Sequence, residues 1–334
     1  KWVIRNTIFS HFCGGETIDQ CKDTFRSLKK FNISAMPEYS VEAVSSEEGF
    51  ESYKNDSIDI INFLGKEKLP FIAIKCTGLM DINLLEKISV GEISYQGDEY
   101  LTFKRRMIAL CDKAQKNDVQ VLIDAEETWI QDAIDNMALE LMEIYNRKKT
   151  IVSLTHQCYR VGTLDKIKKN LEIAKDKKFS YGVKLVRGAY MEKERSRATQ
   201  MGYESPIQPT KEMSDKEFND SLEYTVKNIN FSSLWVGSHN EESCSYLMKL
   251  MSDSGIKSDD NRIWFSQLYG MSDNISFVLS DLGYNVVKLI PYGPIEKTIP
   301  YLIRRANENS SVKGQSNRQF TLIKNEINRR KQLN

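Results

Sequence analysis

Short runs of apolar and β-branched residues recur along the chain, and stretches with apolar residues at helical spacing lie between them. The short runs predict eight strands: Asn32–Met36, Pro70–Lys75, Val119–Asp124, Thr150–Thr155, Tyr181–Val186, Leu234–Gly237, Arg262–Phe265 and Asn285–Ile290. The longer stretches predict helices: Tyr100–Ala114, Trp129–Asn146, Leu164–Asp176, Lys216–Asn228, Glu241–Met251 and Asp273–Asp281. Strand-then-helix units without a Pro/Ser-rich linker are typical of one barrel. We therefore predict an α/β protein with a single (β/α)8 TIM-type domain over residues 1–334, of which 309–334 form a C-terminal helical tail.

Polar side chains stand at the ends of five of the predicted strands. They are Lys75; Asp124, Glu126 and Glu127; Thr155, His156 and Gln157; Arg187 and Tyr190; and Ser238, His239 and Asn240. Active sites of such barrels lie at the carboxyl ends of the strands, so these side chains are expected to meet at one mouth. For any one residue the alternative is a polar side chain that simply ends a strand. Five such ends together favour a functional site.

Composition narrows the class of partner. Among 334 residues, 47 Lys and Arg stand against 46 Asp and Glu, so no net field favours nucleic acid. The six cysteines are far apart, without Cys-x-x-Cys pairs and beside three histidines, which predicts reduced intracellular thiols and no metal site. No apolar run approaches the roughly 20 residues that span a bilayer, and no signal peptide is recognisable, so we expect a soluble or peripheral protein.

The segment Tyr301–Asn309 carries a distinctive helix face. Residues at i, i+3, i+4 and i+7 share one side of a helix, which here brings together Tyr301, Arg304, Arg305 and Glu308. Adjacent guanidinium groups repel each other unless a carboxylate, another anion or water offsets their charge, and a planar fork suits a carboxylate best. The alternative is a solvated basic helix.

The chain lacks the motifs of the common nucleotide sites. No Gly-x-Gly-x-x-Gly follows a strand, no P-loop occurs, and no Gly-x-Ser-x-Gly elbow is present. The predicted strand ends and the C-terminal helix instead offer a cationic set: Lys75, Lys184, Arg187, Arg304 and Arg305. Such a set suits a small carboxylate and a pyrophosphate together, which suggests a dinucleotide cofactor.

Eight segments, separated along the chain but in the same order, resemble the proline dehydrogenases, which are the FAD-dependent barrel enzymes of proline catabolism. The resemblance is to the monofunctional, eukaryote-like branch of that family. The matching segments are Phe12-Cys-Gly-Gly-Glu16-Thr, Ile123-Asp124-Ala-Glu-Glu127, Thr155-His-Gln157 with Tyr159, Lys184-Leu-Val-Arg187-Gly-Ala-Tyr190, Ser238-His-Asn240, Gln267-Leu-Tyr-Gly270, Pro291-Tyr-Gly293 and Tyr301-Leu-Ile-Arg-Arg-Ala-Asn-Glu308-Asn. They span residues 12 to 309, and chance agreement over so many separated positions is remote.

The resemblance implies a role for each matching residue. In the substrate site, Arg304 and Arg305 would clamp a carboxylate with Lys75, Asp124 would balance Lys75, Tyr301 and Leu268 would pack on the ring, and Glu16 would form an ion-pair gate with Arg304. In the FAD site, the implied contacts are Gln157, Lys184, Arg187, Gly188, Lys211, His239, Asn240 and Glu308, with Lys184 near the reacting edge of the ring and Arg187 and His239 at the pyrophosphate. No metal is implied.

Leu289 departs from the family pattern, because most members carry a tyrosine there, near the substrate ring. The sequence places it at the end of the last strand, where a substitution would affect specificity and leave folding almost unchanged. Hydroxyproline dehydrogenases also lack this tyrosine but have a small polar residue. A leucine adds apolar volume without a hydroxyl, which would disfavour a ring hydroxyl.

Three hypotheses of function follow. The first is oxidation of L-proline to Δ1-pyrroline-5-carboxylate, by hydride transfer from C5 to flavin N5, with electrons passed to a quinone and a functional link to pyrroline-5-carboxylate dehydrogenase on the way to glutamate. The second is a paralogue that oxidises hydroxyproline or another cyclic amino acid. The third is a catalytically silent flavin-binding barrel.

The family also implies a location: the matrix side of the mitochondrial inner membrane for a eukaryotic protein, or the cytoplasm or membrane periphery for a bacterial one. The basic tail after Asn309 is expected either to be a solvated helix or to contact anionic lipid.

Overall fold

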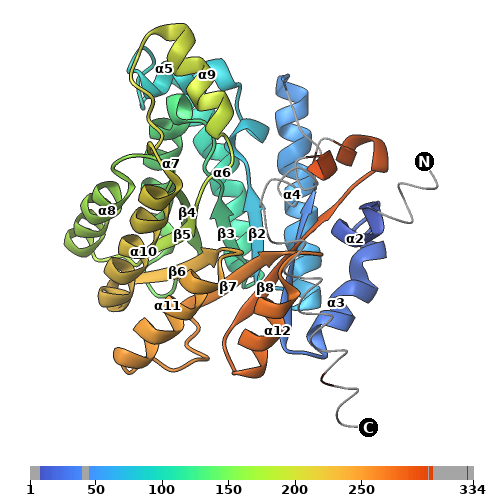
Figure 1. Cartoon of the computed structure of the whole chain (residues 1–334). Helices are drawn as coiled ribbons and strands as arrows, with labels where there is room; N and C mark the ends of the chain where they lie inside the picture. Colours follow the sequence, from blue (N-terminus) through green and yellow to red (C-terminus); the bar gives the residue numbers. More distant parts are fainter. Residues whose placement is uncertain (1–7, 40–44, 300, 304–328, 330–334) are drawn as a thin grey trace.

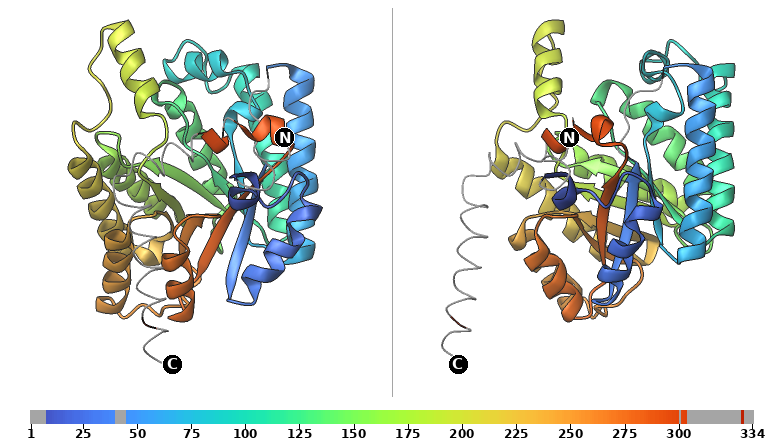
Figure 2. Two further views of the ribbon diagram at one scale, coloured as in Figure 1. Left: turned by 45° about the vertical axis from the view of Figure 1, so that its right-hand side comes forward. Right: turned by 90° about the vertical axis from the view of Figure 1, so that its right-hand side faces the viewer.

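The computed structural model describes residues 8–39, 45–299, 301–303 and 329. Its centre is one sheet of eight parallel strands, which confirms every strand that the apolar runs predict. The strands are β1 (Ile33–Tyr39), β2 (Phe71–Ile74), β3 (Gln120–Ile123), β4 (Val152–Gln157), β5 (Tyr181–Val186), β6 (Ser232–Gly237), β7 (Ile263–Leu268) and β8 (Val286–Tyr292). The predicted (β/α)8 barrel is therefore confirmed, with the helices outside the strands (Figures 1 and 2).

The barrel has one seam. Hydrogen-bonded neighbours follow the order β1-β8-β7-β6-β5-β4-β3-β2, so the first strand pairs with the last. Within the described part of the chain, β1 and β2 share no ladder. Pro37 lies in β1, and Pro291 pairs with Glu38 from the neighbouring β8. Proline is tolerated at a sheet edge because it has no N–H to donate.

Helices cover the outside of the barrel. Those of eight residues or more are α3 (Lys22–Lys29), α4 (Glu47–Glu67), α5 (Ile82–Ser89), α6 (Asp98–Lys116), α7 (Thr128–Tyr145), α8 (Thr163–Lys177), α9 (Met191–Met201), α10 (Lys211–Lys227), α11 (Glu241–Asp253) and α12 (Asp273–Asp281), and a short α2 spans Ser10–Phe12. All six predicted helices are present. The structure adds α3, α4, α5 and α9, and α10 begins at Lys211 because Thr210 caps it by accepting from Met213 N.

Two of the three buried apolar clusters are layers of the barrel itself. The larger lies between strands and helices, and the smaller fills the barrel interior with Met36, Phe71, Leu122, Trp235, Val287 and Leu289. The prediction that Leu289 stands at a strand end is therefore wrong. β8 continues to Tyr292, so Leu289 is central in the strand, 9% exposed, and pairs in register with Met36 and Leu268.

All six cysteines are buried and carry free thiols. Among the helices of the described ranges, none is both long and apolar enough to cross a membrane.

Candidate active site

Four charged side chains of alternating sign cross the barrel mouth. Lys75 follows β2, and its Nζ lies 3.0 Å from Glu38 Oε1 of β1 and 3.3 Å from Asp124 Oδ2 after β3. The other oxygen of Asp124 accepts from Lys184 Nζ of β5 at 2.6 Å. Two carboxylates and two ammonium groups thus form one neutral chain, Glu38–Lys75–Asp124–Lys184.

The charges in this chain stabilise one another. The carboxylate of Glu38, followed by that of Asp124, holds the pKa of Lys75 well above its usual range although burial opposes this. Burial alone would raise the pKa of Asp124, but the ammonium groups of Lys184 and Lys75 outweigh it and lower that pKa. Lys75 and Asp124 are therefore charged near neutral pH.

A row of donors lies beside this chain inside the barrel. Thr155 of β4, Lys184 of β5 and Trp235 of β6 are register neighbours, and Lys184 Nζ lies 4.9 Å from the centre of the Trp235 ring. Thr155 Oγ1 and Trp235 Nε1 are buried and find no hydrogen-bond partner among the described residues. Leaving such groups unsatisfied costs about 1–3 kcal/mol each. The row therefore fits a ligand that brings acceptor atoms, as the polar edge of a flavin ring does.

Arg187 stands at the end of β5 over the ring of Phe218, 4.5 Å from its centre. Its Nε donates to Asp215 at 2.6 Å, and its two terminal nitrogens donate to the hydroxyls of Ser238 and Ser243 at 3.0 Å each. A guanidinium has five N–H donors, so two remain for a ligand. Lys211 contacts the other oxygen of Asp215 at 2.5 Å. The structure thus brings both predicted cations onto one carboxylate.

The amides predicted to bind the cofactor also hold the mouth together. Gln157 donates to the carbonyl of Glu126 at 2.8 Å and accepts from Ala189 N at 3.1 Å, which ties β4 to the segments after β3 and β5. Asn240 caps α11 by accepting from Ser243 N at 2.8 Å. Each amide has lost part of its hydrogen-bonding capacity to the protein.

Gly188 and His239 are fixed by close neighbours. Gly188 has φ +139°, and a Cβ built there would meet the ring of Tyr159 at 1.2 Å, so only glycine fits. The ring of His239 is held at Nδ1 by Ser272 Oγ at 2.9 Å and at Nε2 by Leu268 N at 3.5 Å. Both residues therefore have defined positions at the mouth.

The predicted apolar wall of the substrate site is also assembled. Tyr301 packs in a cluster with Phe9, Phe12, Cys13, Met271, Ile295 and Leu302, and Leu268 contacts that cluster as well as the interior layer that holds Leu289. Glu16 lies near the end of β8, where its Oε2 accepts from Ile295 N at 3.4 Å. The described residues do not include Arg304, Arg305 or Glu308. The predicted ion-pair gate between Glu16 and Arg304 therefore lies outside them as well.

Three residues of this arrangement do not follow from the sequence pattern: Glu38, Asp215 and Trp235. Glu38 lies 37 positions before Lys75 and Asp215 lies 28 positions after Arg187, so no local spacing connects them. Trp235 looks like an ordinary core residue of a strand. The one available signal is that Glu38 is a charged residue two positions after the predicted strand Asn32–Met36. His156, in contrast, is among the predicted strand-end residues but turns away from the mouth, toward Tyr181.

The fold and this mouth define an enzyme-type barrel with charged groups at the carboxyl ends of its strands. The chain belongs to the proline dehydrogenase family, because the family model described as proline dehydrogenase matches residues 21–318. The expected family is thereby confirmed.

Individual relatives agree with this assignment. Mitochondrial proline dehydrogenase 1 of Homo sapiens is 38% identical over 229 residues, which cover 68% of this chain and 38% of that protein. Hydroxyproline dehydrogenase of Xenopus laevis is 30% identical over 369 residues, which cover 99% of this chain and 79% of the relative. The chain therefore spans well under half the length of the human relative.

A solved structure supports the fold. Proline utilization A of Bdellovibrio bacteriovorus superposes with a TM-score of 0.84 and 22% identity, over 93% of this chain and 34% of that one.

Proposed function

We propose that this protein oxidises L-proline to Δ1-pyrroline-5-carboxylate with FAD as cofactor and passes the electrons to a quinone. The observation that carries the proposal is the alternating chain Glu38–Lys75–Asp124–Lys184 at the mouth of a proline dehydrogenase barrel. FAD, when bound, supplies the hydride acceptor at N5 for the hydrogen on C5 of proline.

The residues of the chain would bind and orient the substrate. Lys75 keeps its charge through Glu38 and Asp124, so it can attract a carboxylate without titrating near neutral pH. Arg304 and Arg305 are proposed to complete the carboxylate clamp, and Leu268 and Tyr301 to hold the ring. A substrate fixed in this way needs no strong protein base if its amine binds in the neutral form. Holding C5 of the substrate against the flavin lowers the activation barrier of the reaction through orientation alone.

Other residues would bind the cofactor. Lys184 is buried with its ammonium group between Asp124 and the face of Trp235, where a cation stabilises negative charge on a reduced ring. Arg187 and His239 are proposed to meet the pyrophosphate, with the remaining contacts from Gln157, Gly188, Lys211, Asn240 and Glu308.

A second candidate substrate is hydroxyproline or another cyclic amino acid. Its support is Leu289, which lies in the interior layer where a polar aromatic side chain is usual in the family, together with the similarity to a hydroxyproline dehydrogenase. The apolar environment of Leu289 disfavours a hydroxyl on the substrate ring, so unsubstituted proline remains the first choice.

The absorption spectrum of the flavin tests these alternatives. Proline should bleach the visible flavin bands of the purified protein under anaerobic conditions. Bleaching by hydroxyproline or another cyclic amino acid alone would select the paralogue, and no bleaching by any of them would select a silent barrel.

The carboxylate clamp has its own test. Arg305→Met should keep its flavin and weaken proline binding more than tenfold, because a charge-assisted bond to a carboxylate contributes roughly 1.5–3 kcal/mol. The exposed Arg105→Met, which donates to Thr102, serves as a matched control. Unchanged proline affinity in Arg305→Met would remove this residue from the clamp.

The wider context is also a proposal. Eukaryotic relatives carry mitochondrial names, which supports the mitochondrial inner membrane as the location of a eukaryotic protein. The product would pass to a pyrroline-5-carboxylate dehydrogenase. The quinone would be reached by peripheral contact with the membrane.

A further inference from the structure

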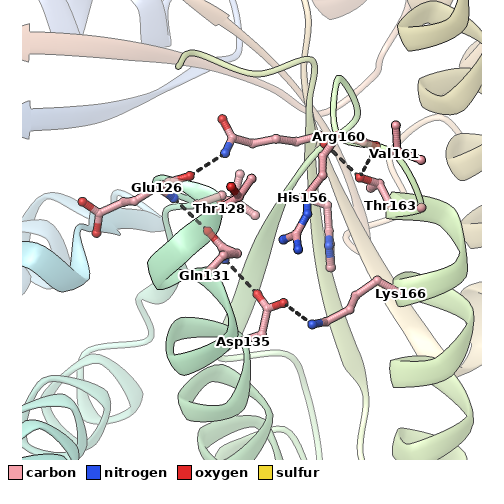
Figure 3. A pocket seen from close by; sticks show the side chains of 13 residues that line it. Glu126, Thr128, Gln131, Asp135, His156, Arg160, Val161, Thr163 and Lys166 are labelled. Atoms are coloured by element: carbon pink, nitrogen blue, oxygen red, sulfur yellow. Dashed lines mark hydrogen bonds and ion pairs between the residues drawn. The ribbon is translucent and has the colours of Figure 1, made fainter. Parts of the chain in front are cut away.

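A second cavity lies beside the barrel mouth, between α7, β4 and the start of α8 (Figure 3). Its volume is about 80 Å³. The charged and polar side chains around it include Gln131, Asp135, His156, Arg160 and Lys166. His156 points out of the barrel wall, whereas the next residue, Gln157, ties the mouth together. The cavity therefore opens on the outer side of β4, and it borders the cofactor positions described above through Thr155 and Gln157, which also line it.

The carboxylate that faces this cavity already has partners. Gln131 accepts from Glu126 N at 2.9 Å and donates to Asp135 Oδ1 at 2.8 Å. Asp135 Oδ2 forms an ion pair with Lys166 at 2.9 Å, and Lys166 also contacts Asp132 at 2.8 Å. The acidic side of the cavity is thus neutralised from within the protein.

Glu126 is also engaged elsewhere. Its carboxylate accepts from Thr77 N at 3.0 Å and from Thr77 Oγ1 at 2.5 Å, on the side of β2. Burial raises its pKa, which these bonds oppose.

His156 offers a hydrogen-bond donor. Its Nε2 lies 2.7 Å from the hydroxyl of Tyr181, and that hydroxyl accepts from Asn170 Nδ2 at 3.0 Å. A hydroxyl that already accepts from Asn170 can donate its own proton to His156 Nε2, and we take Nε2 as the acceptor in this pair. Burial lowers the pKa of His156 to about 4, so the ring is neutral and carries its proton on Nδ1.

Arg160 offers a second, charged donor. The backbone around it is held by bonds from Arg160 N to Gln157 O at 3.0 Å and from Thr163 Oγ1 to Arg160 O at 3.0 Å. Figure 3 shows the guanidinium pointing from this loop into the cavity, next to His156. Among the residues that the structure describes, no carboxylate forms an ion pair with it.

We propose that this cavity binds a compact oxyanion, a carboxylate or a phosphate, through the Arg160 guanidinium and His156 Nδ1–H. The carboxylates around the cavity already have partners, whereas these two donors have none among the described residues, so the complementary ligand is an acceptor. A guanidinium fork matches two oxygens of such a group. The volume is several times the space that one water needs, which admits a group of a few heavy atoms.

Calorimetric titration with inorganic phosphate and, separately, with acetate tests the proposal. The protein is supplied with FAD and proline so that the anion positions at the mouth are filled, and chloride keeps the ionic strength constant. Phosphate, acetate or both should bind at one site. Arg160→Gln should weaken that binding at least tenfold, and Arg160→Lys should be intermediate because it keeps the charge without the fork.

Controls separate this site from general charge effects. Arg105→Gln makes the same charge change on the exposed face of α6 and should bind the anion as wild type does. Arg160→Gln should leave the KM for proline unchanged. Unaltered anion affinity in Arg160→Gln, equal weakening in Arg105→Gln, competition between the anion and proline, or no binding of either anion to the wild type would each overturn the proposal.

Discussion

Asp124→Asn should destabilise the protein by removing the charge at the centre of the alternating chain. The substitution keeps the shape of the side chain. Lys75 would retain Glu38 at 3.0 Å, but Lys184, which is only 5% exposed, would keep only the face of Trp235 among the residues that the structure describes. The loss therefore falls mainly on Lys184.

The magnitude follows from this geometry. Removing one partner of a buried ion pair costs about 3–5 kcal/mol, and the lower end applies here because Asp124 and Lys75 are partly hydrated. An unfolding entropy of about 2.1 cal/mol/K per residue gives about 0.7 kcal/mol/K for 334 residues, so Tm should fall by roughly 4 °C. The pKa of Asp124 is lowered in the folded state, so its stabilisation is complete at neutral pH and is lost only as pH falls through that pKa. The difference between wild type and variant should thus be constant from about pH 6 to about pH 8.

A double-mutant cycle with Lys184→Met isolates the interaction. Denaturation in urea should give a coupling energy above about 1 kcal/mol, because the second substitution removes the stranded ammonium group. Asp165→Asn, which breaks an exposed pair with Lys168, is the control and should cost less than about 0.5 kcal/mol. Additive effects of Asp124→Asn and Lys184→Met would refute the reasoning.

Three further substitutions test other parts of the mouth. Leu289→Tyr should lower stability by about 1–3 kcal/mol through overpacking and change the ratio of kcat/KM between proline and ring-substituted analogues about tenfold; unfolding and steady-state assays measure both, and wild-type values would make the position neutral. Glu38→Gln should cost about 1.5–3 kcal/mol in chemical denaturation because Lys75 loses its shorter charged contact; wild-type stability would argue against that contact. Gly188→Ala should give protein with little flavin, because its Cβ meets Tyr159; a normal ratio of flavin to protein absorbance would contradict this.

The strands were predictable because strands of a parallel barrel are buried on both faces and read as apolar runs. Two prolines hid the ends of the first and last strands. Pro37 and Pro291 read as strand terminators, yet Pro37 lies in the edge strand β1 and Pro291 lies in β8 beyond Leu289, the last residue that pairs with β7, so neither position needs a second ladder N–H. Leu289 was wrongly predicted to stand at a strand end because the predicted last strand stopped at Ile290, before Pro291. Helix α4 was missed because only four of its residues are buried, so its apolar stripe is thin.

The candidate site was predictable in part. Lys75, Asp124 and Lys184 follow from the rule that barrel chemistry collects at the carboxyl ends of strands. Their partners Glu38 and Trp235 do not, because the contacts join strands that are distant in the chain and depend on barrel closure. The outward orientation of His156 was missed for a local reason. Side chains alternate along β4, so His156 faces outward while its neighbours Thr155 and Gln157 face the barrel.

The seam of the barrel has a consequence for the order in which the site assembles. Within the described residues, β1 pairs in the sheet only with β8, so the first strand of the chain waits for the last before it gains main-chain partners. During synthesis, Glu38 leaves the ribosome about 250 residues before β8 is made. Lys75 and Asp124 can meet as soon as β2 and β3 pair, but the carboxylate of Glu38 joins them only when the nascent chain is nearly complete. The pair between Glu38 and Lys75 would therefore form last, and a ribosome-bound chain stopped before Val286 should lack that pair.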